Sequence, residues 1–407
     1  MRPWMRYGWL ILIVFLIIAS LLGCSPGDDP YRQLRNELRH QVPHKFSLTR
    51  WVVVALIDQI RPSFVLRDPL RDLSPQERVA RVEEFFVLVE QARNWQIKQE
   101  ENEAKGGILQ QERIQGRKAE LGNKVEKILQ EQVRGILRAQ GVHHPWFGTL
   151  PLKIFFPPLV VEIDPAPHIL VISPRERIIP LAQILLQPDI DWQIIEELEN
   201  QLEDKFNVSA AVTDRLTGLA TFPVLIADDR DLRTAIRTIA DEWTHHFLFF
   251  TPLGRALAFD FYNFDLRVVN ETIACIVAEE ITDLVIGKYY RHIIDEQEIR
   301  AQNERADKFH SELRKIKRVV DEYLAQGKIY EAERLMEDSR IDLLEKGFYV
   351  RRLNQAYLAR WTPYPMVSVN PLAERVKEIR EQSQDLGEFL QRMSKTRTPR
   401  DLERGVE

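Results

Sequence analysis

The chain has 407 residues, of which 44% are hydrophobic and 29% are charged. This apolar fraction supports a buried core and excludes a chain that is disordered throughout, and the length predicts two or three folded units. The formal net charge is −5 and no strongly basic block occurs. We therefore exclude a dedicated nucleic-acid-binding protein and expect no nucleic-acid partner.

The N-terminus has the order of an export signal. Two arginines precede an apolar run over residues 9–22, which is shorter than the roughly 20 residues that span a bilayer. The tetrapeptide ending at Cys24 resembles the bacterial lipobox, in which the cysteine becomes a lipidated first residue. We expect a signal peptide over residues 1–23, a lipidated tether over residues 24–30 and a protein on the extracytoplasmic face of the cell membrane. An uncleaved anchor is the alternative, and it gives the same orientation.

Residues 31–144 form a strongly charged region with a helical pattern. Ser74 precedes a proline and an apolar periodic stretch, which predicts an N-cap and a helix over residues 74–92. The stretch over residues 96–140 is rich in Gln, Glu, Lys and Arg, and it predicts a long helix or a helical hairpin that breaks near Gly106.

The composition changes near residue 145, where prolines, β-branched residues and aromatics become frequent. Such runs between Pro-containing turns are typical of strands. We expect strands over residues 152–156, 159–163 and 168–172, a helix over residues 191–205, and a further strand pair over residues 208–212 and 218–226.

Helical patterns dominate the rest of the sequence. We expect two apolar helices over residues 232–250 and 269–289, and a charged helical hairpin over residues 295–345 that turns near Gly327. The order of elements predicts an α+β fold that is mainly α: a long helical N-terminal region, a small mixed sheet and a helical C-terminal half.

One of the apolar helices carries acidic and imidazole side chains opposite its apolar stripe. In the helix over residues 232–250 the large apolar residues recur at helical spacing. Asp241 and His245 are four residues apart, so they share the opposite face, and Glu242 lies one step around the helix.

A further carboxylate follows about one helix later. Glu271 comes directly after Asn270 and leads an otherwise apolar run, where a carboxylate is costly to bury without a partner or a metal. The small side chains of Ala274 and Cys275 would let another helix pack closely against this one.

The pattern Glu242-x-x-His245, followed by Asn270-Glu271-x-x-Ala, resembles the gluzincin metallopeptidases, and it is close to bacterial predicted aminopeptidases. In that group an HExxH helix supplies two zinc-binding histidines and a general-base glutamate, and an Asn-Glu-x-x-Ala helix supplies a third ligand.

The resemblance covers residues 208–358. A later Asn-x-Ala segment of the group corresponds to residues 354–356. The resemblance implies zincin-like helices and a metallopeptidase domain with C-terminal helices over residues 145–400.

The resemblance also implies a role for each matching residue. His245 and Glu271 would bind one Zn²⁺ per chain, with Asp241 in place of the group's first histidine. Glu242 would be the general base that takes a proton from water, and Tyr357 would stabilise the oxyanion.

Aspartate at position 241 departs from the group's pattern. Two carboxylates on the metal instead of one would lower its Lewis acidity and favour Mn²⁺ or Fe²⁺ over Zn²⁺. Three supporting residues are expected around the ligands. His246 points about 100° away from its neighbour along the helix and so cannot share the metal; we expect it to support the ligands together with Asn270 and Glu280.

Two functions are consistent with these residues. The first is a membrane-tethered extracytoplasmic metallopeptidase that hydrolyses peptide or protein substrates through a metal-activated water. The alternative is a catalytically degenerate envelope protein that acts as a binding module or scaffold.

Overall fold

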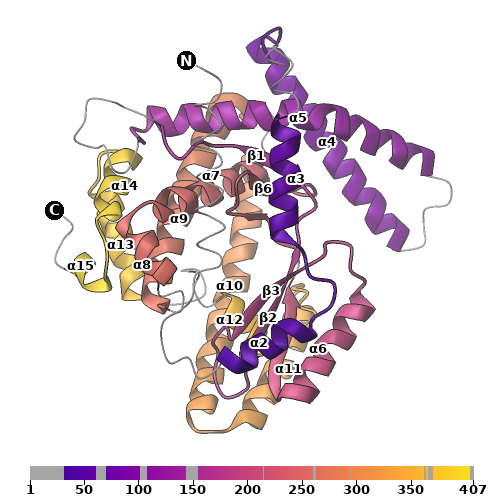
Figure 1. Ribbon diagram of the computed structural model, residues 1–407, viewed down its shortest axis with the longest axis vertical. Coiled ribbons are helices and arrows are strands. Elements are labelled where there is room, and N and C mark those ends of the chain that lie inside the picture. The colour runs from indigo at the N-terminus through magenta and orange to yellow at the C-terminus, as the bar shows by residue number, and fades with distance from the viewer. Residues whose placement is uncertain are drawn as a thin grey trace.

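The computed structural model describes residues 32–60, 70–100, 108–143, 155–213, 215–259, 263–293, 295–361, 364 and 370–403. The fold is α+β and mainly α, as the sequence predicts (Figure 1). Within these residues no helix is long and apolar enough to cross a membrane. The predicted signal peptide and tether, including Cys24, lie outside the described residues, as do Gly106 and most of the strand predicted over residues 152–156.

The N-terminal region is helical. Ser74 caps the helix that follows it, because its hydroxyl accepts a hydrogen bond from the Glu77 N–H at 3.2 Å and the Glu77 carboxylate accepts one from the Ser74 N–H at 2.7 Å. This helix and the next form a hairpin whose two arms contact each other and cross in the view of Figure 1. The helices of this region are α2 (Arg32–Gln41), α3 (Leu48–Ile60), α4 (Pro75–Glu100) and α5 (Ile108–Ala139).

The strands form two sheets of three strands each. The first, in the order β1-β6-β5, is mixed, because β1 runs parallel to β6 whereas β5 is antiparallel to it. The second, in the order β3-β2-β4, is antiparallel. The strands are β1 (Val161–Asp164), β2 (His168–Pro174), β3 (Ala182–Leu186), β4 (Val208–Thr213), β5 (Gly218–Leu219) and β6 (Val224–Ala227).

The expected pairing of residues 208–212 with residues 218–226 is wrong. Strand β4 pairs with β2 in the second sheet, and residues 218–226 contain β5 and most of β6, which pair with each other in the first sheet. The single predicted strand is divided in two because Pro223 has no N–H for a sheet hydrogen bond, and the Thr221 hydroxyl donates to the Pro223 carbonyl at 2.7 Å. Strand β3 was not predicted.

The second sheet is buried on both faces. Alternate residues of β2 enter different cores. Ile169 and Val171 pack with the charged helical hairpin over residues 296–345, whereas Leu170 and Ile172 pack with α2 and with the helix over residues 192–206 on the opposite face. The helices around this sheet are α2 and α6 (Trp192–Phe206) on one face, and α10 (Glu296–Ala325), α11 (Ile329–Glu345) and α12 (Gln355–Trp361) on the other.

The largest core lies beside the first sheet, where α7 and α9 pack against each other and against α5. Buried Tyr290 donates a hydrogen bond from its hydroxyl to Gln132 of α5 at 2.7 Å. The N-terminal hairpin therefore shares one core with the later helices. The remaining helices are α7 (Leu232–Phe249), α8 (Pro252–Phe259), α9 (Phe264–Val285), the π-helical turn η2 (Ile286–Tyr290), α13 (Pro371–Glu381), α14 (Leu386–Ser394) and α15 (Pro399–Glu403).

A buried carboxyl connects the hairpin to the first sheet. Glu126 of α5 is 5% exposed and accepts a hydrogen bond from the Ile163 N–H at 2.9 Å. Burial, reinforced by the negative charge of Glu162, raises the pKa of Glu126 to about 8. The folded chain therefore keeps this carboxyl protonated at a pH where the unfolded chain has ionised it.

We predict that Glu126→Gln stabilises the protein, because the amide keeps the acceptor oxygen and removes the titration. Since the pKa is raised on folding, the gain is absent near pH 4, grows as the pH rises through the range from 4.5 to 8, and reaches about 3 kcal/mol at pH 7. Chemical denaturation of both variants across this pH range measures it. The exposed Glu112→Gln on the same helix is the control, and a gain that did not change with pH would contradict the assignment.

Candidate metal centre

Helix α7 presents two chemically different faces. Asp231 caps its N-terminus by accepting a hydrogen bond from the Thr234 N–H at 2.9 Å. Trp243 is fully buried, its indole N–H donates to the Pro157 carbonyl at 3.0 Å, and Phe155 stacks on its ring. This packing fixes the rotation of α7 about its axis, so that the opposite face, with Asp241 and His245, turns toward α9.

The side chains predicted as metal ligands come together on that face. Nε2 of His245 lies 3.8 Å from Asp241 Oδ2 on its own helix and 3.8 Å from Glu271 Oε2 on α9. The ligand atoms of Asp241, Glu242 and His245 all lie within 4.8 Å of one another. The side chains of Asp241, His245 and Glu271 are 21%, 19% and 18% exposed, so the group is enclosed but reachable from solvent. We call Asp241, Glu242, His245 and Glu271 the α7–α9 cluster.

Asn270 orients the imidazole. Its Oδ1 lies 2.7 Å from Nδ1 of His245, and an amide oxygen only accepts, so Nδ1 carries the hydrogen. In the neutral ring the lone pair of His245 is then on Nε2, which faces the two carboxylates. A hydrogen bond to the distal ring nitrogen is the usual way in which a metal-binding histidine is held in one orientation.

The donor set fits a divalent cation. Ligand atoms around a tetrahedral zinc ion lie about 3.3 Å from one another, given bonds of about 2.0–2.1 Å. The two 3.8 Å separations from Nε2 of His245 exceed this spacing by about 0.5 Å, whereas the group whose ligand atoms all lie within 4.8 Å of one another contains Glu242 and not Glu271. One imidazole and two carboxylates suit Zn²⁺ and, because the oxygens are hard ligands, also Mn²⁺ or Fe²⁺.

The protein's own charges perturb both central groups. Burial opposes the charged imidazolium, but Glu271, Asp241 and Glu242 outweigh it and raise the pKa of His245 to about 9. Burial, reinforced by Asp241, raises the pKa of Glu242 to about 8. At neutral pH His245 is therefore protonated, and its positive charge lies between the carboxylates, where a metal cation would otherwise bind.

Two residues beside the cluster were missed by the sequence analysis. Arg360 of α12 donates a hydrogen bond to the Tyr364 hydroxyl at 2.8 Å. Burial works against the charge of Arg360, but Tyr364, Glu271 and Glu242 raise the pKa of the guanidinium and keep it protonated. No spacing rule relates position 360 to α7 or α9, because α12 follows them by more than 70 residues.

Tyr357, the predicted oxyanion stabiliser, lies one turn before Arg360 on α12. Its N–H donates to Asn354 Oδ1 at 3.0 Å, and its ring packs near Trp361 against the core under the second sheet. The charge of Arg360 acts on Glu242 of the cluster and lowers its pKa against the effect of burial.

The first sheet borders the cluster on the side of Glu242. Strand β5 is an edge strand, and a side chain at Gly218 would come within 3.3 Å of the Glu242 side chain. His246 is buried beside the same segment, where burial lowers its pKa to about 4 although the backbone of Ala220 acts in the opposite direction. His246 therefore stays neutral at pH 7 and faces the β5 side of α7.

Glu280 is engaged elsewhere on α9. Its two oxygens accept hydrogen bonds from Arg380 of α13, each at 2.7 Å, which ties α13 to α9. Cys275 lies closer to the cluster, and burial raises the pKa of its thiol to about 12, so it stays protonated.

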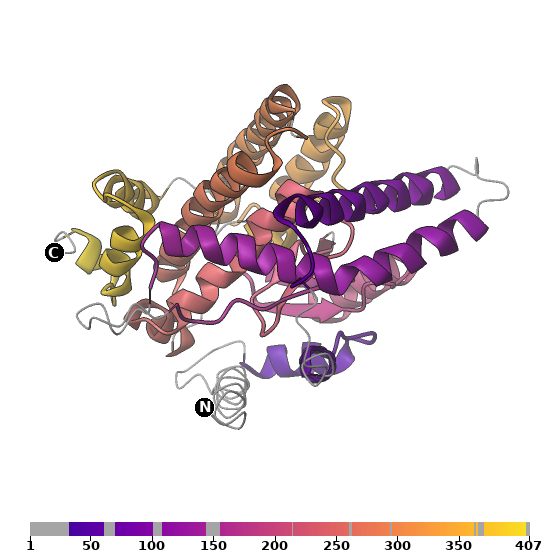
Figure 2. The same cartoon turned by 90° about the horizontal axis from the view of Figure 1, so that it is seen from above.

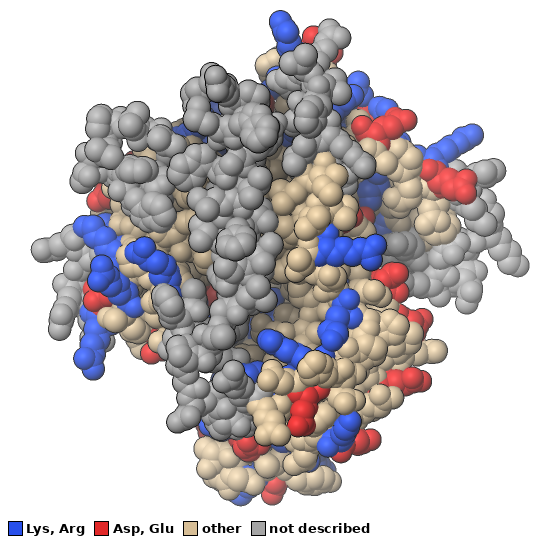
Figure 3. Space-filling view, viewed as in Figure 1, with Lys and Arg blue, Asp and Glu red and all other residues tan. Residues whose placement is uncertain are grey.

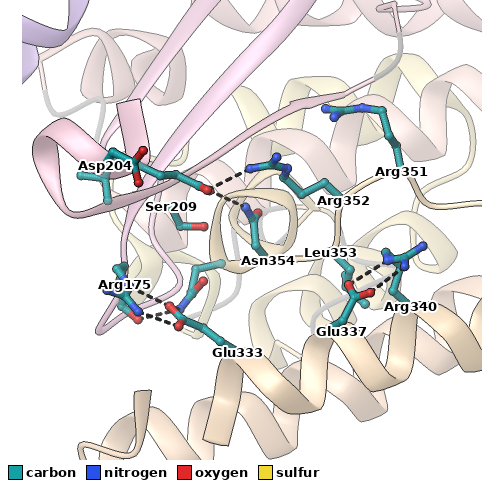
Figure 4. A pocket seen from close by; sticks show the side chains of 13 residues that line it. Arg175, Asp204, Ser209, Glu333, Glu337, Arg340, Arg351, Arg352, Leu353 and Asn354 are labelled. Carbon is teal, nitrogen blue, oxygen red and sulfur yellow. Dashed lines mark hydrogen bonds and ion pairs between the residues drawn. The ribbon is translucent and has the colours of Figure 1, made fainter. Parts of the chain in front are cut away.

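The Asn354 segment lines a separate pocket of about 640 Å³, to which no residue of the α7–α9 cluster contributes (Figure 4). Its guanidinium groups are paired: Arg175 with Glu333, Arg340 with Glu337 and Arg352 with Glu203. Asn354 donates to the Ala210 carbonyl at 2.9 Å. These contacts fasten α12 and α11 to the second sheet.

No protein-family profile, curated protein or solved structure matches the chain. The case for a function therefore rests on its own residues.

We predict that metal binding releases protons and strengthens with pH. A metal-binding imidazole must be neutral, whereas the pKa of His245 is raised to about 9. The apparent affinity for Zn²⁺ should rise about tenfold per pH unit between pH 6 and 8, with at least one proton released per ion. Calorimetry in buffers of different ionisation enthalpy measures both quantities, and an affinity independent of pH would exclude His245 as a ligand.

Proposed function

We propose that the protein is a metallopeptidase-like hydrolase held at the extracytoplasmic face of the cell membrane by a lipid on Cys24 or by an uncleaved N-terminal anchor. The observation that carries the enzymatic part is the convergence of Asp241 and Glu271 on Nε2 of His245, at 3.8 Å each. The resemblance of the two motifs to gluzincin metallopeptidases supports it, because the same residues have the corresponding order in the sequence.

In this proposal Asp241, His245 and Glu271 hold one divalent cation, Zn²⁺ or else Mn²⁺ or Fe²⁺. Such an ion supplies Lewis acidity for a peptide carbonyl and lowers the pKa of water. Glu242 takes the proton of the attacking water and passes it to the leaving amine. Asn270 keeps the His245 ring in its working orientation.

Neighbouring elements give the substrate a place to bind. The free edge of β5 is suited to pairing with the backbone of an extended peptide, which would lie beside Glu242. The Arg360 guanidinium, supported by Tyr364, is suited to stabilise the negative charge that develops on the carbonyl oxygen. The substrate class is therefore a peptide or an extended segment of a protein.

A binding or scaffold role is the second candidate, and the protonation of His245 favours it. An imidazolium between two carboxylates is electrostatically satisfied without a cation, and such a cluster can serve only to join α7 to α9. Metal content and turnover distinguish the two roles.

We predict that Glu242→Gln lowers peptidase turnover about 100-fold or more while the chain keeps one bound metal ion, because the amide cannot accept the proton. His245→Ala should lose the ion. Elemental analysis and cleavage of a fluorogenic peptide library measure the two effects on the full chain in detergent. The exposed residues Glu197 and His40 provide matched controls as Glu197→Gln and His40→Ala. Unchanged turnover in Glu242→Gln would remove the mechanism, and a metal-free, folded wild-type protein would favour the scaffold.

We further predict that Asp241→His increases the affinity for Zn²⁺ about tenfold or more, because imidazole is a softer ligand and the position already faces His245 from one turn away. Competition with a chromophoric chelator measures the affinity. An affinity equal to that of the wild type would mean that position 241 does not bind the metal.

A further inference from the structure

Helices α2 and α3 form a layer of their own on one side of the molecule (Figures 1 and 2). Leu38 and Val42 hold the layer to the body, because both are buried in the core on one face of the second sheet. Trp51 donates a hydrogen bond from its indole to Asp164 at 2.6 Å and packs against the small cluster around Leu225, and Lys45 forms an isolated bridge with Leu186. We call residues 32–57 the α2–α3 arm.

The outer face of α3 is apolar and uncovered. Val53, Val54 and Ile57 are 45%, 49% and 47% exposed and lie on one side of the helix, while Val52 and Ala55 on the opposite side are buried. Single exposed apolar residues are ordinary, but three β-branched residues together form a patch that calls for a partner. Thr49 and Arg50 are the exposed polar residues in the first turn of this helix.

The charge of the arm is opposite to that of the chain. Residues 32–60, which contain both helices, include five Lys or Arg residues and two acidic residues, although the whole chain has a net charge of −5. Arg39, Lys45 and Arg50 are exposed. In the view of Figure 3, Lys and Arg side chains project from the middle of the face that α3 crosses in Figure 1, while most visible Asp and Glu side chains lie nearer its right-hand and lower edges.

The position of the arm in the chain identifies the partner. Seven residues separate Cys24 from the first residue of α2, and a fully extended segment of this length reaches about 25–30 Å. A chain attached to a membrane at or before Cys24 therefore keeps the arm close to the bilayer. Apolar side chains flanked by exposed basic residues match the acyl boundary and anionic headgroups of such a surface.

We propose that the α2–α3 arm lies on the membrane, with Val53, Val54 and Ile57 in the lipid interface and the basic side chains at anionic headgroups. The inference rests on the proposed membrane attachment, but not on catalysis. The arm adds a second, oriented membrane contact to the N-terminal tether, and this contact fixes which side of the protein faces the bilayer.

The test uses the full chain reconstituted into vesicles of phosphatidylethanolamine and phosphatidylglycerol at a ratio of three to one. An environment-sensitive fluorophore is attached at Val54→Cys and, as the matched control, at Tyr349→Cys, where the native side chain is 77% exposed and distant from the arm in sequence. We expect nitroxide-labelled lipid to quench the fluorophore at position 54, and aqueous iodide to quench it at least threefold less than at position 349.

Charge is tested in the same vesicles. Arg50→Glu should at least halve the quenching by lipid at position 54, whereas Arg334→Glu, at a side chain that is 74% exposed on α11, should leave it unchanged. Equal iodide quenching at positions 54 and 349 would overturn the proposal. Protection from iodide without quenching by lipid would overturn it too, because a protein partner or a second copy would then cover the patch.

Mass spectrometry of the N-terminal peptide separates this inference from the tether. Lipid on Cys24 together with an iodide-accessible position 54 would refute the arm contact and leave the tether intact. An unmodified Cys24 together with a lipid-quenched position 54 would refute lipidation and support the arm contact.

Discussion

The packing of α7 against α9 is the constraint on which the rest of the structure depends. Trp243 and its apolar neighbours are buried on one side of α7, and this burial leaves its polar side no orientation except toward α9. On α9, apolar residues around Glu271 enter the same core. The side chains that converge at His245 are thus positioned by the hydrophobic contacts behind them.

That packing forces like charges together. Asp241, Glu242 and Glu271 surround one imidazole, and all four are largely enclosed. Removing carboxylates from water is unfavourable unless positive charge compensates, and here a proton on His245 and the guanidinium of Arg360 supply it. In the proposed function, this surplus of negative charge would bind a cation when His245 gives up its proton.

The surrounding scaffold is arranged to hold these two helices rigidly. The hairpin α4–α5 contributes to the same core, and Gln132 of α5 hydrogen bonds to Tyr290 just after α9. Glu280 and Arg380 fasten α13 to the far end of α9. The α2–α3 arm takes no part in that core: it adds a basic, apolar outer surface to a body that is otherwise acidic.

Local patterns in the sequence determined much of this protein. The periodicity of α7, the cap at Ser74 and the turn at Gly327 each depend on a few neighbouring residues, so α6, α7 and the α10–α11 hairpin were predicted almost to their ends. The predictions missed the end of α4 by eight residues and the start of α9 by five. The spacing of Asp241 and His245 likewise fixed their common face. Tertiary structure alone decided which strands pair, because β4 and β5 are close in sequence yet belong to different sheets. It also placed Arg360 where its charge acts on Glu242, since that depends on how α12 docks. Contacts between distant segments arise from the burial of whole faces, and no short stretch of sequence encodes the partner that a face will meet.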